Sequence, residues 1–194
     1  MVFKQQTCSV LVVSATGKFT DVLNQLLSES EYAPVTYASS VAAARRLLLD
    51  RVYDFVIINA PLSDEIGTKL AIDVCRSNNM VALLLVKHDI VEETNAKVVP
   101  YGVFTLSKPT APQALVQGLQ WMRSARERLR GFEKKSASMD EKMEEIRLVN
   151  RAKWLLIEKL TMTESDAHRY IEKQAMDQCV SRREIAKGII QTYT

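Results

Sequence analysis

The sequence of 194 residues has few of the residues that build disulfide frameworks, metal centres and catalytic triads. Its three cysteines, Cys8, Cys75 and Cys179, lie far apart with no CxxC pair, and it has only two histidines. Zinc fingers, iron–sulfur sites and disulfides are therefore poor candidates. Apolar runs are too short to span a membrane, and the N-terminus lacks a signal-peptide pattern. We expect a cytoplasmic protein, with no membrane segment, no cofactor, no metal and no enzymatic activity.

The net charge of +3 is unevenly distributed along the chain. Residues 1–122 carry 10 basic and 11 acidic side chains, whereas residues 147–194 carry 9 basic and 6 acidic ones, an excess of three. An anionic partner is expected to bind where positive charge accumulates. A solvated helical face has the same signature, so charge alone leaves both interpretations open.

The first 110 residues alternate between strand-like and helix-like segments. We expect strands over residues 9–13, 34–37, 55–58, 81–86 and 103–106, and helices over residues 19–27, 41–49, 70–76 and 92–97. Short β-branched runs such as SVLVV are typical of buried parallel strands. The alternation predicts an α/β fold with a five-stranded parallel, doubly wound sheet in a domain of residues 1–121.

From Thr110 onward the strand signal ends and apolar residues recur at heptad spacing. This spacing predicts a helical coiled-coil linker over residues 122–146 and a homodimer formed through one seam. The predicted dimer seam comprises Ala125, Leu129, Phe132, Met139, Met143 and Ile146. The alternative is an amphipathic helix that packs within the monomer. Gly131 and the capping-box sequence at residues 138–141 leave two alternatives open, a continuous helix and a kink or break near residues 131–138.

Residues 147–194 predict a small three-helix domain. The first helix is expected to end near Lys159, Thr163 to begin the second, and Ser181 with Glu184 to cap the third. Apolar residues at helical spacing form the expected core: Val149, Ala152, Leu156, Ala167, Ile171, Ala175, Ile185, Ala186, Ile189 and Ile190.

The first domain resembles the receiver domain of response regulators. The resemblance rests on element order, on Lys108-Pro109 after the fifth strand, and on Gly67 eight residues after Asn59. It implies two acidic residues after the first strand, a phosphate-accepting aspartate after the third and a hydroxyl residue after the fourth. Those positions hold Ser14 and Ala15, Asn59, and Val86 respectively.

These replacements remove the chemistry of a receiver. Mg²⁺ prefers carboxylate oxygens, and an amide is not a phosphoryl nucleophile in the manner of a carboxylate. We therefore predict a degenerate receiver that is not phosphorylated, with Lys108 either hydrogen-bonded to Asn59 or solvated. Asp64 is expected to be a turn residue rather than a substitute acceptor.

The C-terminal residues resemble the ANTAR domain, an RNA-binding module of bacterial transcription antiterminators. The resemblance rests on Arg151-Ala152-Lys153, on the residues from Glu164 to Ala167, on residues 173–176 and on residues 181–186; Trp154 and His168 depart from the family pattern. It implies that the chain binds hairpins in nascent leader transcripts.

Basic side chains on the outward helix faces are expected to contact the RNA. These predicted contact residues are Lys153, Arg169, Lys173, Arg182, Arg183 and Lys187. For Trp154 we favour burial in the bundle over stacking on a base. Two other functions remain open: a DNA-binding response regulator, and an interaction adaptor whose receiver-like domain docks a regulatory protein.

Overall fold

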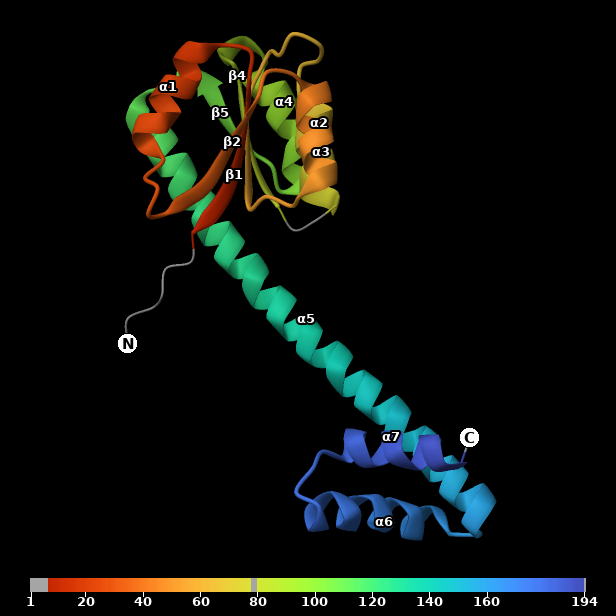
Figure 1. Ribbon diagram of the computed structural model, residues 1–194. Helices are drawn as coiled ribbons and strands as arrows, with labels where there is room; N and C mark the ends of the chain where they lie inside the picture. The colour runs from red at the N-terminus through yellow and green to blue at the C-terminus, as the bar shows by residue number, and fades with distance from the viewer. Residues whose placement is uncertain (1–6, 78–79, 194) are drawn as a thin grey trace. The chain divides into compact units, whose positions relative to one another are not determined.

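The computed structural model describes residues 7–77 and 80–193 of the chain, which divides into two compact units. The first, Met1–Arg130, is called the sheet unit, and the second, Gly131–Thr194, the helical unit. Figure 1 shows the strands in the sheet unit and the two short C-terminal helices in the helical unit.

Five parallel strands form the sheet of the sheet unit. They are β1 (Cys8–Ser14), β2 (Tyr32–Ala38), β3 (Phe55–Asn59), β4 (Val81–Lys87) and β5 (Phe104–Lys108), in the order β2-β1-β3-β4-β5. Every pairing is parallel, so the predicted five-stranded parallel sheet is confirmed. Strands β1, β3 and β4 are buried along almost their whole length, as their uninterrupted apolar runs predict.

Helices cover both faces of this sheet (Figure 1). On one face α1 (Gly17–Leu26) and the first part of α5 (Pro112–Leu160) enclose a core that includes Leu23, Leu115 and Met122. On the other face α2 (Val41–Asp50), α3 (Thr68–Ser77) and α4 (Val91–Val98) enclose a second core. Short 3-10 turns at His88–Ile90 and Val99–Tyr101 flank α4.

Two loop residues shape the sheet unit near its carboxyl edge. The Asp64 carboxylate accepts hydrogen bonds from the backbone N–H groups of Val41 (3.0 Å) and Ala42 (2.9 Å) at the start of α2. These two bonds lower the pKa of Asp64, which is therefore a helix-capping residue. Gly67 has φ +88°, and a Cβ there would lie 2.8 Å from Ile58 Cγ2, so both the backbone conformation and the space require glycine.

Helix α5 is continuous from Pro112 to Leu160, so of the two alternatives for residues 131–138 the structure has the continuous helix. The sheet unit extends to Arg130 rather than to residue 121. Ala125 and Leu129 pack against its core, which corrects their assignment to the dimer seam, because their side chains are already used within the monomer. The other four seam residues are exposed: Phe132, Met139, Met143 and Ile146.

In the helical unit, α6 (Glu164–Asp177) and α7 (Arg182–Tyr193) pack with the end of α5. The buried residues that they share are Ala152, Leu156, Ala167, Ile171, Ala186 and Ile189. Thr163 Oγ1 accepts a hydrogen bond from the N–H of Asp166 (3.2 Å). Ser181 and Glu184 bond each other's backbone N–H groups at 3.1 and 3.2 Å, so the predicted capping box is confirmed.

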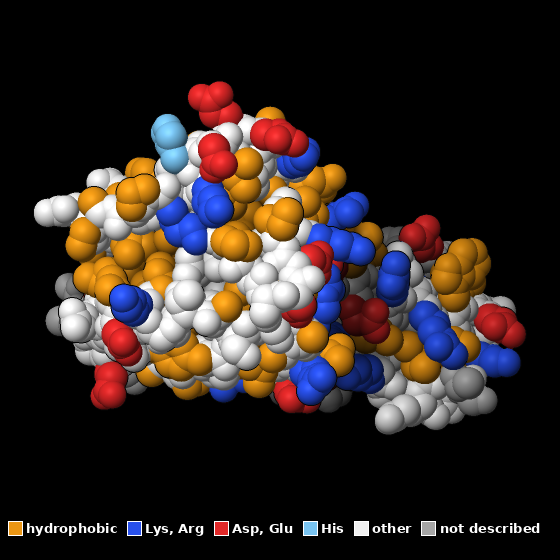
Figure 2. All heavy atoms as spheres, turned by 90° about the horizontal axis from the view of Figure 1, so that it is seen from above, with side chains coloured by type: hydrophobic (Ala, Val, Ile, Leu, Met, Phe, Trp, Pro, Cys, Tyr) orange, Lys and Arg blue, Asp and Glu red, His pale blue; other side chains and the backbone are white. Residues whose placement is uncertain are grey.

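Charged side chains of both signs are interspersed with hydrophobic ones on the face of the molecule seen in Figure 2. Within the part of the chain that the structure describes, no helix combines the length and apolar character needed to cross a membrane.

Candidate nucleic-acid interface

The carboxyl ends of β1, β3 and β5 bring together the residues that stand at receiver-like positions. The register pairs Ser14 with Asn59. The Asn59 amide donates from Nδ2 to Ser14 Oγ (3.1 Å), and its Oδ1 accepts from Lys108 Nζ (2.9 Å). Lys108 also donates to the carbonyl of Ala60. Of the two alternatives for Lys108, the structure therefore has the hydrogen bond to Asn59.

The same site contains little negative charge. Ala15 is exposed and Val86 is fully buried. Burial, and then the charge of Lys87, lower the pKa of Lys108. Among residues 7–77 and 80–193, no group of three or more His, Cys, Asp or Glu side chains could hold a metal ion. The amide, hydroxyl and ammonium groups thus satisfy one another.

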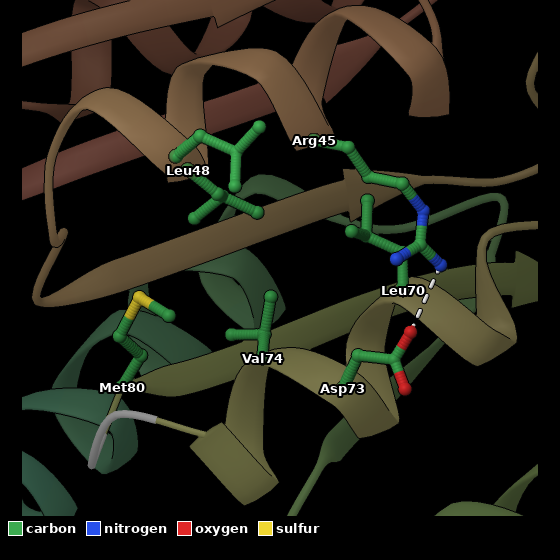
Figure 3. A pocket seen from close by; sticks show the side chains of 7 residues that line it. Arg45, Leu48, Leu70, Asp73, Val74 and Met80 are labelled. Atoms are coloured by element: carbon green, nitrogen blue, oxygen red, sulfur yellow. Dashed lines mark hydrogen bonds and ion pairs between the residues drawn. The ribbon is translucent and has the colours of Figure 1, made fainter.

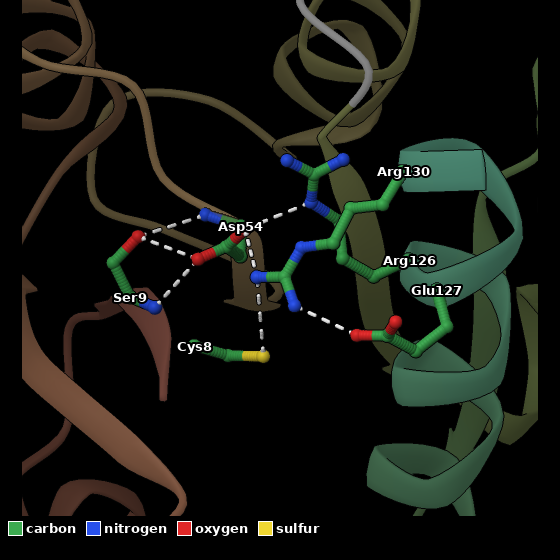
Figure 4. Close-up of polar contacts among 6 residues, drawn as sticks. All are labelled: Cys8, Ser9, Asp54, Arg126, Glu127 and Arg130. Atoms are coloured by element: carbon green, nitrogen blue, oxygen red, sulfur yellow. Dashed lines mark hydrogen bonds and ion pairs between the residues drawn. The ribbon is translucent and has the colours of Figure 1, made fainter. Parts of the chain in front are cut away.

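At the opposite end of the sheet, a carboxylate just before β3 binds the surface of α5 (Figure 4). Asp54 Oδ1 accepts from Arg126 Nε (2.8 Å) and Arg130 Nη2 (2.9 Å). Its Oδ2 accepts from the backbone N–H (2.9 Å) and hydroxyl (3.1 Å) of Ser9. Burial alone would raise the pKa of Asp54, but the bonds from Arg126, Ser9 and Arg130 outweigh it, so this pKa lies below its usual value. The cluster fixes this part of α5 to the sheet unit.

A hollow of about 380 Å³ lies between α2 and α3 (Figure 3). Leu48, Leu70, Val74 and Met80 line it, and the ion pair between Arg45 and Asp73 (2.9 Å) spans one side. It shares no residue with the Asn59 site, and apart from the ion pair its lining residues are apolar.

The helical unit places the predicted RNA-contact residues in three different environments. Arg169 and Lys173 on α6, and Lys187 on α7, are exposed. Lys153 is half-buried and pairs with Glu164 (3.1 Å), and Arg182 pairs with Glu145 (3.2 Å) and Glu172 (3.8 Å). Arg169 and Lys173 are four residues apart on the helix face opposite the buried alanines and isoleucine, as the sequence predicts.

Arg183 differs from the outward-facing residue that the sequence predicts. It is half-buried, and its Nε is a buried atom without a hydrogen-bond partner in the described structure. Arg183 lies three residues before the buried Ala186, so its stem runs along the packed side of α7. Arg169 and Lys173 are therefore better candidates for pure phosphate contacts.

Two adjoining hollows on the helical unit share Asn150 and Lys153, and we call them together the α5 groove. The larger, about 450 Å³, is lined by Lys142, Glu145, Ile146, Val149, Asn150, Lys153, His168 and Arg182. The smaller, about 240 Å³, is lined by Asn150, Lys153, Trp154, Ile157 and Glu164.

The predicted burial of Trp154 is wrong, since its side chain is 71% exposed. Trp154 lies between the buried Ala152 and Leu156 in the sequence, and two residues turn an α-helix by roughly 200°. The indole therefore faces away from the bundle core and lines the smaller part of the α5 groove. In the sequence, the offset of two residues between Trp154 and each of the core positions Ala152 and Leu156 predicts this exposure.

Residues 137–190 match the family model of the ANTAR domain, so the chain contains an ANTAR domain in this region. The match begins within the segment that the sequence assigns to the linker. The chain is also similar to the transcriptional regulatory protein PdtaR of Mycobacterium tuberculosis strain H37Rv. The two are 27% identical over 174 residues, which cover 88% of this chain and 83% of the relative.

Solved structures of receiver domains are similar to about two thirds of this chain. The signal receiver domain of an HD domain-containing protein from Pseudomonas fluorescens Pf-5 is 27% identical, with a TM-score of 0.56 over 69% of this chain and 96% of that one. A CheY-like receiver domain protein from Methanospirillum hungatei JF-1 is 18% identical, with a TM-score of 0.54 over 67% and 99%. The sheet unit therefore has the receiver fold, and a long helix follows it.

Proposed function

We propose that this chain is a transcription antiterminator that binds hairpins in nascent leader transcripts as a homodimer. The single observation that carries the proposal is the ANTAR match over residues 137–190, which spans the exposed basic side chains Arg169, Lys173 and Lys187. The similarity to a transcriptional regulatory protein over most of both chains supports a regulatory role. The proposed role is non-enzymatic.

Binding of leader RNA, compared with duplex DNA of the same sequence at one salt concentration, tests this proposal. We expect the full chain to prefer the RNA stem-loop, and a preference for the duplex would favour a DNA-binding regulator instead. Replacing Arg169 and Lys173 with Ala removes two phosphate contacts. The affinity for RNA is expected to fall, and the slope of log K against log salt to shrink by about 1.4 units for single-stranded loops.

The matched control replaces Lys18 and Lys69 with Ala, because both are exposed lysines of the sheet unit. This variant loses the same bulk charge and is expected to bind RNA like the wild type. Equal weakening by both pairs would place the RNA site outside the exposed face of α6.

We propose further that the sheet unit is a receiver that does not accept phosphate. Asn59 supplies an amide in place of a carboxylate, and Ser14 and Lys108 already occupy its two polar atoms. The activity of such a chain is then regulated by something other than phosphorylation, such as the binding of a regulatory protein to the sheet unit.

Incubation with acetyl phosphate and Mg²⁺ is therefore expected to leave the mass of the intact chain unchanged. The Asn59→Asp variant is expected to behave in the same way, since Ser14 and Ala15 still provide no carboxylate for the metal. Intact-mass spectrometry measures both. A gain of one phosphoryl group that disappears in Asn59→Ala would contradict the proposal.

A homodimer is proposed through the exposed stripe of α5 formed by Phe132, Met139, Met143 and Ile146. These apolar side chains are 51–69% exposed in the monomer, and they recur at spacings of seven, four and three residues. Such a stripe is typical of a coiled-coil seam between two copies of one helix.

A further inference from the structure

The α5 groove combines an apolar wall with both hydrogen-bond donors and acceptors. Val149 and Ile157 supply the wall, whereas the Asn150 amide has a carbonyl oxygen and two N–H donors. Two cations of the groove are partly neutralised by carboxylates. Glu145 Oε1 lies 3.2 Å from Arg182 Nη2, and Glu164 Oε1 lies 3.1 Å from Lys153 Nζ. A site built for a phosphate alone has no use for these carboxylates. A planar ring whose edge carries donors and acceptors uses both kinds of group.

An exposed aromatic ring stands at one end of this groove. Trp154 follows Asn150 by four residues, so the two side chains lie next to each other along α5. Such a spacing places an amide next to an indole face. Proteins that recognise unpaired RNA stack bases on aromatic side chains and read their edges with hydrogen bonds.

The junction of the two hollows and the division of charge fit the same ligand. The two parts of the groove measure about 450 and 240 Å³ and meet at Asn150 and Lys153. Three exposed cations do not line the groove and are available to contact the phosphates: Arg169, Lys173 and Lys187. Phosphate contacts give affinity without sequence information, whereas contacts with base edges give specificity.

We propose that the α5 groove binds one unpaired nucleobase of the RNA, stacked on Trp154 and hydrogen-bonded along its edge by Asn150. This inference rests on the proposed RNA-binding function and assigns its specificity to a defined site. Lys153 and Arg182 line the groove and pair with Glu164 and Glu145, and the apolar wall excludes water from the far side of the ring.

A double-mutant cycle between protein and RNA tests the proposal. The probe is a stem-loop that the full-length wild-type chain selects from a library with a randomised loop. Each loop base is then replaced in turn by an abasic site, and Kd is measured for the wild type, Trp154→Ala and Asn150→Ala. At one loop position, loss of the base is expected to weaken wild-type binding by about tenfold or more. At that position the same loss is expected to change Kd of either variant by less than about twofold.

The control variant is Trp121→Ala, since Trp121 is also an exposed tryptophan of α5 but belongs to the sheet unit. It is expected to keep the full abasic penalty. The salt slope of Trp154→Ala is expected to match that of the wild type, because no phosphate contact is lost. Circular dichroism verifies that the variants fold, as the exposure of both tryptophans predicts.

Fluorescence gives a second measurement of the same contact. The chain has two tryptophans, so a Trp121→Phe variant leaves Trp154 as its single indole. Addition of the selected stem-loop is expected to quench this emission, and the abasic stem-loop to leave it unchanged.

The two proposals fail in different ways. If the wild type selects no RNA, both fall. If it binds RNA and replacement of Arg169 and Lys173 lowers the salt slope, while abasic penalties are the same in all variants, the base site alone is overturned.

Discussion

A variant that carries Met139→Asp and Met143→Asp is expected to be a folded monomer at concentrations where the wild-type chain is a dimer. Both methionines are more than half exposed in the single chain. Burial of such a side chain contributes about 1.5–3 kcal/mol, and a symmetric seam buries each one twice. Loss of these contacts, together with the burial of new charges, is expected to raise Kd of the dimer at least 100-fold, as about 3 kcal/mol requires. Sedimentation at a series of concentrations measures it.

The matched control is Ala137→Asp with Ser138→Asp, which adds the same two charges to exposed positions of α5 outside the stripe. This variant is expected to remain a dimer. A monomeric wild type at about tens of micromolar, where weak coiled coils persist, would contradict the seam. A dimer that RNA induces would then be tested by the same measurement with the stem-loop present.

The second large effect is expected at Asp54. In Asp54→Asn, Arg126 and Arg130 lose the carboxylate that they share, although their side chains remain only 14% and 13% exposed. Arg130 keeps its ion pair with Glu127 (2.7 Å). Removal of one partner from a buried ion pair costs about 3 kcal/mol or more. The free energy of unfolding, measured by urea at neutral pH, is therefore expected to fall by about that amount. Asp21→Asn, at an exposed position on α1, is the control and is expected to change it little.

The pH dependence of this difference follows from the lowered pKa of Asp54. The ionised carboxylate contributes its full stability above the pKa of an unfolded aspartate, about 3.9. This contribution is lost as the pH falls through the lower pKa of the folded state. The wild type and Asp54→Asn are therefore expected to converge in stability as the pH falls below about 4. A constant difference down to acidic pH would show that the ion pair is not its source.

The sheet could be predicted because each of its buried strands is marked by a short apolar run in the sequence. Runs such as FVII in β3 are apolar on every residue, which is typical of strands buried on both faces. The caps of α6 and α7 could be predicted equally well, because Thr163, Ser181 and Glu184 form hydrogen bonds with residues only three positions away.

The ion cluster of Asp54 could not be predicted, because Arg126 lies 72 residues away in the sequence. Only the spacing of Arg126 and Arg130, four residues apart, hinted at a shared partner. The sequence left the continuity of α5 open for a different reason. Gly131 costs a helix only about 1 kcal/mol relative to alanine, which the strong helix formers around it offset. Arg183 was misplaced because its charge suggested exposure, whereas its position three residues before Ala186 brings its stem against the packed side.

Transcription through a terminator in vitro tests the central claim most directly. The template carries a leader with the selected stem-loop upstream of an intrinsic terminator, and the measured quantity is the fraction of full-length transcript. The wild-type chain is expected to raise this fraction without any phosphoryl donor, and the Arg169→Ala, Lys173→Ala variant to leave it near the level without protein. An unchanged fraction with a wild type that binds the stem-loop would contradict antitermination as its function.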